Sequence, residues 1–303
     1  KRIVILGSTG SIGKNLISIL IKEKKKFHIH LLSAHKDHKT LLKQVKKFNV
    51  KNVIITDYTS YLVLKKKSKN LNVNIFNNYK ELKNIFKKKV DYVMSSITGV
   101  DGLDPTINII KHTKKIAIAN KESIICGWRI IQKQLNKHKT EFIPVDSEHF
   151  SLWYALNNMN NSLIEKIYLT ASGGPFFKLP LNKFKNIGIN KAIKHPNWQM
   201  GNKISIDSAT MINKVYELIE ARNIFKIPYK KIEILVHPKS YLHAIVKFKN
   251  GLIKIVAHDT TMKIPIFNTL YHNSNKTLKT KNLNLDILNN LNLIKIEPKR
   301  YPM

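Results

Sequence analysis

Short runs of apolar, often β-branched residues alternate with amphipathic stretches through the first half of the chain. Strands are predicted over residues 2–6, 27–33, 52–56, 92–96, 115–119 and 141–145. Between them, apolar residues recur at i, i+3 and i+4, which predicts helices over 12–22, 40–48, 79–87 and 123–138. This alternation is typical of an α/β fold with a doubly wound parallel sheet. We therefore expect a Rossmann-like N-terminal domain over residues 1–146.

The pattern changes after Val145. A strand predicted at 164–170 is followed by a long stretch containing Gly, Pro and Asn, 172–202, which we interpret as a mobile functional loop. A helix over 208–225 and strands over 232–236 and 244–249 come next, and Asn250-Gly251 predicts a tight hairpin into 252–257. The sequence thus predicts a smaller α+β catalytic domain over 147–272. Residues 273–303, rich in Asn and Lys, are expected to be a linker.

Composition narrows the class of protein. The chain has 303 residues, of which 43% are hydrophobic, enough for globular domains with proper cores. It shows no apolar run long enough to cross a bilayer and no signal sequence, so we expect a cytoplasmic protein, with a plastid-type organelle as the other possibility. Its one cysteine, Cys126, excludes an internal disulfide and a cysteine-based zinc cluster.

The charge of +34 is the unusual property. A basic excess makes nucleic acids, anionic membranes and acidic small molecules candidate partners. Here, however, the lysines are scattered in short runs interleaved with asparagine, and no nucleic-acid-binding motif is present. We interpret the excess as solvated surface that attracts phosphorylated small molecules, and we expect no specific nucleic-acid or membrane partner.

A glycine motif, GSTGSIG at 7–13, directly follows the first predicted strand and opens the first predicted helix. Glycines at these positions allow a tight turn, the close approach of a pyrophosphate and the packing of helix on strand. The alternative is a plain turn. After the second strand, Lys36 favours a cofactor with a 2′-phosphate, NADP, whereas the adjacent Asp37 opposes it.

Two acidic residues, Asp146 and Glu148, follow the predicted strand that ends at Val145. At i and i+2 of an extended segment, both carboxylates would face one cation, and oxygen ligands suit Mg²⁺ or Mn²⁺. Taken alone, Asp-Ser-Glu is more often the N-terminal cap of a helix.

Further polar residues occur in the second half of the chain. Asn213, Lys214 and Glu217 share one helix face, which predicts phosphate donors and a third metal ligand, or else an exposed face with an ion pair. Ser172-Gly173-Gly174 resembles a phosphate-binding turn, although a bare loop is the simpler alternative. The segment 195–200 contains His195, Trp198 and Met200, which could close over a substrate or belong to the core.

Together these motifs resemble the 1-deoxy-D-xylulose 5-phosphate reductoisomerase family. The resemblance rests on GSTGSIG at 7–13, ANKES at 119–123, PVDSEH at 144–149, SGGPF at 172–176, HPNWQMG at 195–201, KISIDSATMINK at 203–214 and EAR ending at 222. It implies an enzyme, an NADPH-dependent oxidoreductase that needs a divalent metal. Its reaction rearranges 1-deoxy-D-xylulose 5-phosphate and reduces it to 2-C-methyl-D-erythritol 4-phosphate for isoprenoid synthesis. The family also suggests a homodimer.

The resemblance assigns a role to each matching residue. It implies Lys121, Glu148, His195 and Glu217 as catalytic residues, and Asp146, Glu148 and Glu217 as metal ligands. The implied substrate-binding residues are Lys121, Ser147, Glu148, Ser172, His195, Trp198, Met200, Ser208, Asn213, Lys214 and Glu217, with Ser172, Ser208, Asn213 and Lys214 holding the phosphate. His149 and His243 are implied as supporting histidines. The implied cofactor-binding residues are Gly7, Thr9, Gly10, Ser11, Ile12, Gly13, Lys36, Asn120, Lys121, Glu122 and Gly201.

The chain also departs from the family pattern. Asp37 stands where it could weaken the grip on a 2′-phosphate, and Val215 replaces a glycine beside the site. Family members continue into a helical C-terminal domain, which we expect to be missing here, so an inactive truncated form is one alternative. Another is a sugar-phosphate oxidoreductase or epimerase. Such an enzyme needs a Tyr-x-x-x-Lys pair, and the pair noticed, Tyr61 and Lys65, comes too early in the nucleotide-binding domain.

Overall fold

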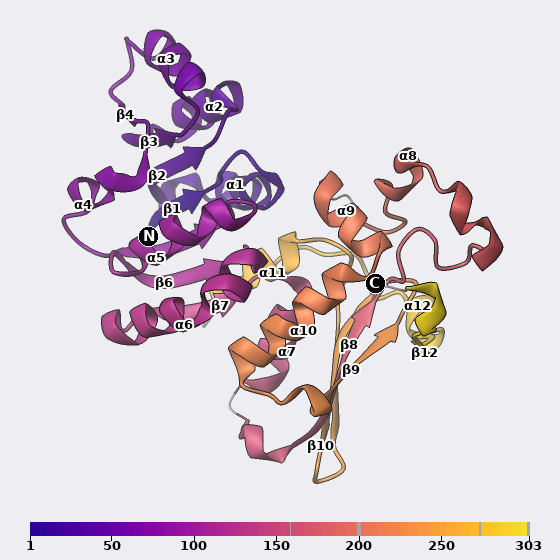
Figure 1. The fold of residues 1–303 in the computed structure, drawn as a ribbon. Coiled ribbons are helices and arrows are strands. Elements are labelled where there is room, and N and C mark those ends of the chain that lie inside the picture. Colours follow the sequence, from indigo (N-terminus) through magenta and orange to yellow (C-terminus); the bar gives the residue numbers. More distant parts are fainter. Residues whose placement is uncertain (158, 199–200, 273, 302–303) are drawn as a thin grey trace. The chain divides into compact units, whose positions relative to one another are not determined.

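The computed structural model describes residues 1–157, 159–198, 201–272 and 274–301. The chain divides into two compact units, which are described separately (Figure 1). The first contains residues 1–145 and the described residues of 266–274; the second contains 146–265 and the described residues from 275 onward. In the described part of the chain, every helix is too short or too polar to span a membrane.

The first unit is built on a parallel sheet. Its strands are β1 (Arg2–Leu6), β2 (His28–Ala34), β3 (Asn52–Ile55), β4 (Asn74–Phe76), β5 (Val90–Ser95), β6 (Thr113–Ile118) and β7 (Glu141–Pro144). They lie in the order β4-β3-β2-β1-β5-β6-β7. The central strands are almost wholly buried and apolar, as a sheet covered on both faces requires. This arrangement confirms the predicted Rossmann-like fold.

The helices of this unit follow its strands in alternation. They are α1 (Ser11–Lys22), α2 (His38–Phe48), α3 (Tyr58–Lys67), α4 (Leu82–Ile85), α5 (Leu103–Ile110) and α6 (Lys121–His138). The predicted helix over 79–87 is only a 3₁₀ turn followed by α4. Helix α5 was not predicted, because its Pro105 and β-branched isoleucines are poor helix formers. Pro105 lies in the first turn, however, where no intrahelical N–H is needed.

Part of α11 (Lys263–Tyr271) completes the first unit. The Tyr92 and Thr269 hydroxyls are 2.8 Å apart, and the Tyr271 hydroxyl donates to Glu23 at 2.6 Å. The catalytic domain was expected to extend to residue 272. Here the described residues of 266–274 belong with the first unit, in which apolar side chains such as Phe267 and Leu270 are buried.

The second unit contains a mixed sheet. Its strands are β8 (Ile164–Ala171), β9 (Ile232–Val236), β10 (Leu242–Phe248), β11 (Ile253–Ala257) and β12 (Ile294–Lys295), in the order β11-β10-β8-β9-β12. The strands β8 and β9 pair in parallel, whereas β10 pairs antiparallel with both β8 and β11. The hairpin predicted at Asn250-Gly251 is confirmed. The pairing of β12 with β9 places part of the predicted linker in this sheet.

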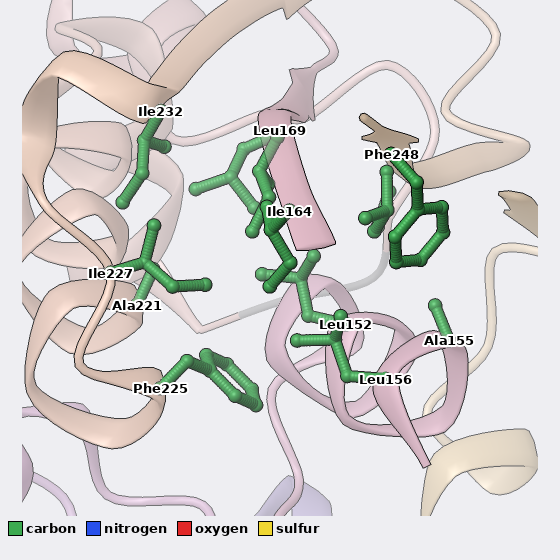
Figure 2. Packing of buried hydrophobic residues seen from close by; sticks show 13 residues of the cluster. Leu152, Ala155, Leu156, Ile164, Leu169, Ala221, Phe225, Ile227, Ile232 and Phe248 are labelled. Atoms are coloured by element: carbon green, nitrogen blue, oxygen red, sulfur yellow. The ribbon is translucent and has the colours of Figure 1, made fainter. Parts of the chain in front are cut away.

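Two helices, α7 (Ser147–Leu156) and α10 (Ile212–Phe225), contribute to the core of the second unit (Figure 2). Leu152 and Leu156 of α7 and Phe225 of α10 pack with Leu169 and Phe248 of the sheet. Burial of these side chains stabilises the unit by roughly 1.5–3 kcal/mol each. The packing holds α7 and α10 in the second unit, and these two helices carry the polar residues described below.

The prediction of one helix over 208–225 was wrong. The structure has two helices, α9 (Asn202–Ala209) and α10, separated at Met211, whose φ of 62° is left-handed. A left-handed residue interrupts the helical hydrogen bonds, and methionine gives no sequence signal for it. Ser208 therefore lies in the last turn of α9. The stretch 172–202 contains a 3₁₀ helix at 181–186 and the short α8 (Ile189–Ala192).

Candidate active site

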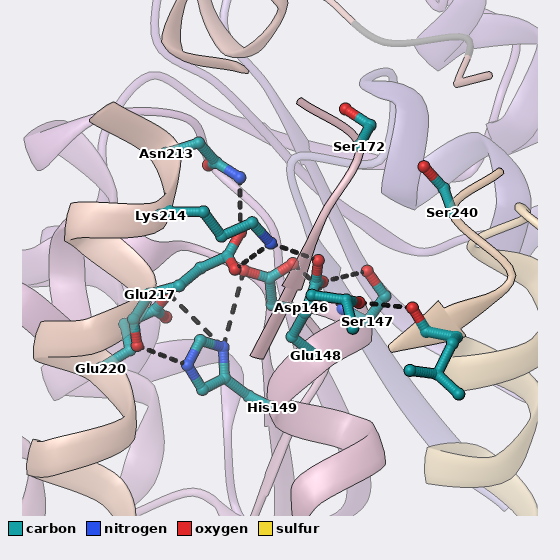
Figure 3. Close-up of polar contacts among 12 residues, drawn as sticks. Asp146, Ser147, Glu148, His149, Ser172, Asn213, Lys214, Glu217, Glu220 and Ser240 are labelled. Carbon is teal, nitrogen blue, oxygen red and sulfur yellow. Dashed lines mark hydrogen bonds and ion pairs between the residues drawn. The ribbon is translucent and has the colours of Figure 1, made fainter. Parts of the chain in front are cut away.

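Three carboxylates converge at the beginnings of α7 and α10 in the second unit (Figure 3). Asp146 caps α7 by accepting a hydrogen bond from the Ser147 N–H at 3.0 Å, Glu148 lies in the first turn of α7, and Glu217 lies on α10. One oxygen of each lies within 4.8 Å of the others. The extended geometry expected for Asp146 and Glu148 was wrong, since α7 begins at Ser147. Helix capping and convergence on one point occur together.

Lys214 lies between two of these carboxylates. Its Nζ is 2.5 Å from Glu148 Oε1 and 2.5 Å from Glu217 Oε2. Burial alone would lower the pKa of Lys214, but the two carboxylates raise it above its ordinary value. Burial would likewise raise the pKa of Glu148, but the Lys214 ammonium holds it below its usual range. The lysine is charged and screens the two acids from each other.

This donor set fits a divalent cation. The carboxylates of Asp146, Glu148 and Glu217 exceed the Lys214 ammonium by two negative charges, which one divalent ion balances. Carboxylate oxygens are the ligands that Mg²⁺ and Mn²⁺ prefer. Because Glu217 is only 1% exposed, an unbalanced charge there would be costly.

His149 and Glu220 lie behind the carboxylates, and the sequence analysis gave no role to Glu220. Both are buried, and His149 Nδ1 is 3.6 Å from Asp146 Oδ2 and 3.6 Å from Glu220 Oε2. Its Nε2 is 2.9 Å from the backbone oxygen of Glu217. Burial would lower the pKa of His149, but Glu220, Asp146 and Glu217 together raise it to about 9. As an imidazolium, His149 donates to the Glu217 carbonyl and connects α7 to α10.

We expect Glu220→Gln to weaken metal binding. Removing the charge that stabilises the His149 imidazolium loosens the support of two ligands, and changes in such supporting residues typically cost about 10- to 100-fold in metal affinity. Titration with Mn²⁺ measures the effect. Glu233→Gln, which removes a half-exposed carboxylate 3.3 Å from Lys166, is the control. Equal Mn²⁺ affinity of Glu220→Gln and the control would contradict this role.

Ser172 and His195 are brought together after β8. The Ser172 hydroxyl oxygen is 2.8 Å from His195 Nε2 and accepts a hydrogen bond from the Gly174 N–H at 3.0 Å. The backbone N–H groups of Asn197 and Trp198 donate to His195 Nδ1, so Nε2 carries the proton of this neutral imidazole and donates to Ser172. Burial and the nearby Lys214 lower the pKa of His195 to about 4. The Ser172 hydroxyl accepts both bonds and can donate its own hydrogen to an anion.

Asn197 and Ser240 hold this turn, and the sequence analysis did not identify either. The Asn197 amide donates to the Pro238 carbonyl at 2.5 Å and to the Ser240 hydroxyl at 2.9 Å. Ser240 has a φ of 51°, a conformation that sequence patterns do not reveal for serine. Trp198 packs edge-on against His243, with ring centroids 6.0 Å apart. Met200 lies outside the described residues.

Ser208 and Asn213 flank the break between α9 and α10. A side chain at Gly174 would place its Cβ 2.7 Å from the Ser208 carbonyl oxygen, so the Ser172 turn packs directly on the end of α9. The Asn213 amide donates to Glu217 Oε1 (Figure 3). Val215, which replaces a family glycine beside the site, has an exposed side chain. The structure therefore brings Ser172, Ser208, Asn213 and Lys214 into one region of the second unit.

His243 makes the fold sensitive to acid. It stacks on His258 with ring centroids 3.8 Å apart, and burial together with His258 lowers its pKa from 6.5 to about 3. Between these pH values only the unfolded chain takes up the proton. The free energy of unfolding is therefore fully retained above about pH 6.5 and falls as the pH falls towards about 3.

We expect His243→Gln to reduce this loss of stability on acidification. Urea unfolding of the metal-free protein at neutral pH and at about pH 5 measures it. His28→Gln, which changes an exposed histidine, should behave like the original chain. A variant at His243 that loses as much stability as the original chain would contradict the assignment.

The glycine motif forms the loop between β1 and α1 in the first unit. Gly7 has a φ of 81°, and a Cβ there would lie 2.6 Å from the Ser96 carbonyl oxygen. A Cβ on Gly13 would lie 2.5 Å from the Gly7 carbonyl oxygen, so this glycine lets α1 begin against the loop. Because β1 lies between β2 and β5, the loop is at the point where the strand order reverses, the usual nucleotide site of such sheets.

Known proteins with similar sequences show the family to which the chain belongs. Models of the 1-deoxy-D-xylulose 5-phosphate reductoisomerase and of its C-terminal domain match residues 3–127 and 142–225. The Pelagibacter ubique reductoisomerase is 60% identical over 100% of this chain and 79% of its own length, and that of a Wolbachia from Culex pipiens is 41% identical over 93% and 72%. The chain belongs to the 1-deoxy-D-xylulose 5-phosphate reductoisomerase family. It is therefore an NADPH-dependent oxidoreductase and isomerase, as the motifs indicated.

Solved structures of reductoisomerases agree with this membership. The Zymomonas mobilis reductoisomerase in complex with NADPH has a TM-score of 0.90 at 32% identity, covering 100% of this chain and 78% of that one. A reductoisomerase in complex with NADPH, fosmidomycin and magnesium has a TM-score of 0.92 at 31% identity, covering 100% and 77%.

The other residues predicted to bind the cofactor lie at the ends of several helices and strands. Lys36 is exposed after β2, and Asp37 caps α2 by accepting from the Thr40 N–H at 2.9 Å, a structural role for the acid that seemed to oppose NADP. Asn120 caps α6 and also donates to Ile97 and Gly99 carbonyls. Lys121 and Glu122 open α6 in the first unit, whereas Gly201 precedes α9 in the second.

Proposed function

We propose that Asp146, Glu148 and Glu217 hold the divalent metal of the reductoisomerase reaction. In that reaction 1-deoxy-D-xylulose 5-phosphate is rearranged and reduced by NADPH to 2-C-methyl-D-erythritol 4-phosphate. The observation that carries the proposal is the convergence of three carboxylate oxygens within 4.8 Å around a buried lysine. When bound, Mg²⁺ or Mn²⁺ would act as a Lewis acid on the substrate carbonyl and its neighbouring hydroxyl.

The phosphate of the substrate is assigned to Ser172, Ser208, Asn213 and Lys214. Its charge complements the Lys214 ammonium, which the structure holds beside the carboxylates. The Ser172 hydroxyl, with two hydrogen bonds already accepted, is oriented to donate to a phosphate oxygen. The excess of lysines over the surface speeds the arrival of such an anion.

The other substrate contacts are assigned to Lys121, Ser147, His195, Trp198 and Met200. The Ser147 hydroxyl donates its hydrogen to Glu148 Oε2 at 2.5 Å, so its oxygen can accept a hydrogen bond from a substrate hydroxyl beside this proposed metal ligand. His195, as a neutral imidazole, adds no charge next to the phosphate and orients Ser172. Trp198 and Met200 would exclude water over the substrate.

NADPH, which supplies the hydride, is assigned to the first unit. Gly7 and Gly13 allow the tight loop and its packing against α1, and Gly10 leaves room for the pyrophosphate at the start of α1, where the helix dipole favours negative charge. Thr9 of the loop and Ser11 and Ile12 in the first turn of α1 are assigned to the cofactor as well. Exposed Lys36 suits the 2′-phosphate, and Asn120, Lys121, Glu122 and Gly201 complete the assigned contacts.

The active enzyme is proposed to be a cytoplasmic homodimer. The support for a dimer is the edge strand β11, on which Ile253 and Ile255 are more than half exposed on one face. Exposed apolar edge strands pair readily with a second chain. Sedimentation velocity tests it, and a monomer at working concentrations would overturn it. The bacterial relatives support the compartment.

Metal titration tests the proposed ligands. One Mn²⁺ should bind per chain, and Asp146→Asn should weaken its binding by more than about a hundredfold, since even supporting residues cost 10- to 100-fold. The control is Asp286→Asn, which alters an exposed carboxylate on α12 (Leu285–Asn289). Unchanged Mn²⁺ binding by Asp146→Asn would overturn the assignment.

A further inference from the structure

Two side chains near the end of the described chain, Arg300 and Tyr301, contact the loop that follows β8. The Tyr301 hydroxyl donates to the Gly173 carbonyl at 2.7 Å. Arg300 Nη1 donates to the carbonyls of Leu179 at 2.6 Å and Phe176 at 3.2 Å. All of these residues belong to the second unit. Residues 300–301 therefore bind three backbone carbonyls within residues 173–179, which we call the glycine–proline loop.

Arg300 is itself held in place. Its Nε donates to Glu297 Oε2 at 3.3 Å, and its guanidinium lies over the Phe184 ring, 5.7 Å from the centroid. Its side chain is only 15% exposed. A planar guanidinium that stacks on a ring and donates to two carbonyls has a fixed orientation, which a lysine cannot reproduce.

The glycine–proline loop begins next to Ser172. Gly173 and Gly174 have φ values of 82° and 71°, conformations that other residues rarely adopt and that the surrounding structure must hold. The Gly174 N–H donates to the Ser172 hydroxyl, and Gly174 packs against the carbonyl of Ser208. A shift of this loop would move Ser172 and change its packing against the backbone of Ser208, and both serines are assigned to the phosphate.

We infer that Arg300 and Tyr301 are positioning residues for the phosphate of the substrate, because they fasten the glycine–proline loop against the end of α9. The inference rests on the proposed function, since it needs Ser172 to bind the phosphate. Neither side chain is assigned a contact with the substrate. They act through the backbone carbonyls of the loop.

Steady-state kinetics of Tyr301→Phe and Arg300→Met test this role. Loss of a hydrogen bond that orders a binding loop should raise KM for 1-deoxy-D-xylulose 5-phosphate about 2- to 10-fold per variant, with kcat and KM for NADPH unchanged within about twofold. Tyr301→Phe removes one oxygen, so it keeps the test valid if Arg300→Met folds poorly. The matched controls are Tyr229→Phe and Lys299→Met, both at exposed residues.

A double variant separates positioning from a general structural role. If Arg300 acts through Ser172, Ser172→Ala combined with Arg300→Met should raise KM by less than the product of the single effects. Multiplying effects would overturn the inference. A raised KM in Ser172→Ala with none in Tyr301→Phe or Arg300→Met would overturn the inference and leave the phosphate site standing. An unchanged KM in Ser172→Ala would overturn the phosphate site, and the inference with it.

Discussion

Glu217→Gln is expected to lower kcat by more than about a hundredfold while leaving KM for NADPH unchanged. Glu217 is a proposed metal ligand, and changes in residues that merely support a ligand already cost about 10- to 100-fold. The amide keeps the shape of the side chain but removes the charge that Lys214 and the metal require. The cofactor loop lies in the other unit, so NADPH binding should be retained.

The matched control is Glu165→Gln, which removes a carboxylate from an exposed pair with Lys247 on β10. It should keep the original kcat, because exposed pairs contribute little. If Glu217→Gln turned over at the original rate with saturating Mn²⁺, Glu217 would not be a metal ligand.

Lys214→Ala is expected to raise KM for 1-deoxy-D-xylulose 5-phosphate about 10- to 100-fold. A hydrogen bond to a charged group is worth roughly 1.5–3 kcal/mol, which corresponds to that range. Lys214 also forms ion pairs with Glu148 and Glu217. Because its ammonium competes with the metal for these carboxylates, its removal should leave the Mn²⁺ affinity equal or higher.

Kinetics and metal titration of the same preparation distinguish these effects. Lys230→Ala, which changes an exposed lysine, controls for loss of one surface charge and should leave KM unchanged. An unchanged KM in Lys214→Ala would place the phosphate elsewhere, whereas a large fall in Mn²⁺ affinity would show that the lysine instead organises the carboxylates.

The sequence predicted the Rossmann-like sheet because its buried strands are continuous apolar runs bounded by polar residues. It also predicted the residues of the second unit that converge, since Asp146, Glu148, Asn213, Lys214 and Glu217 lie in two short motifs. The spacing of residues alone could not show that these two motifs, which lie on separate helices, come together in the fold. The family resemblance implied it.

Other features had no local signal. The left-handed Met211 that separates α9 from α10, and Ser240 with its φ of 51°, depend on tertiary packing. Glu220 belongs to the EAR motif at 220–222, but only the fold shows that it is buried beside His149. Arg300 and Tyr301 are distant in sequence from the loop that they contact, and no pattern of apolar residues connects such segments.

NADPH consumption by this chain, followed with 1-deoxy-D-xylulose 5-phosphate in the presence and absence of Mn²⁺, shows whether the three carboxylates hold the metal of the reaction. Turnover should require both the substrate and the metal, and Glu217→Gln should abolish it. Turnover that persists without a divalent metal, or equally in Glu217→Gln, would contradict this assignment.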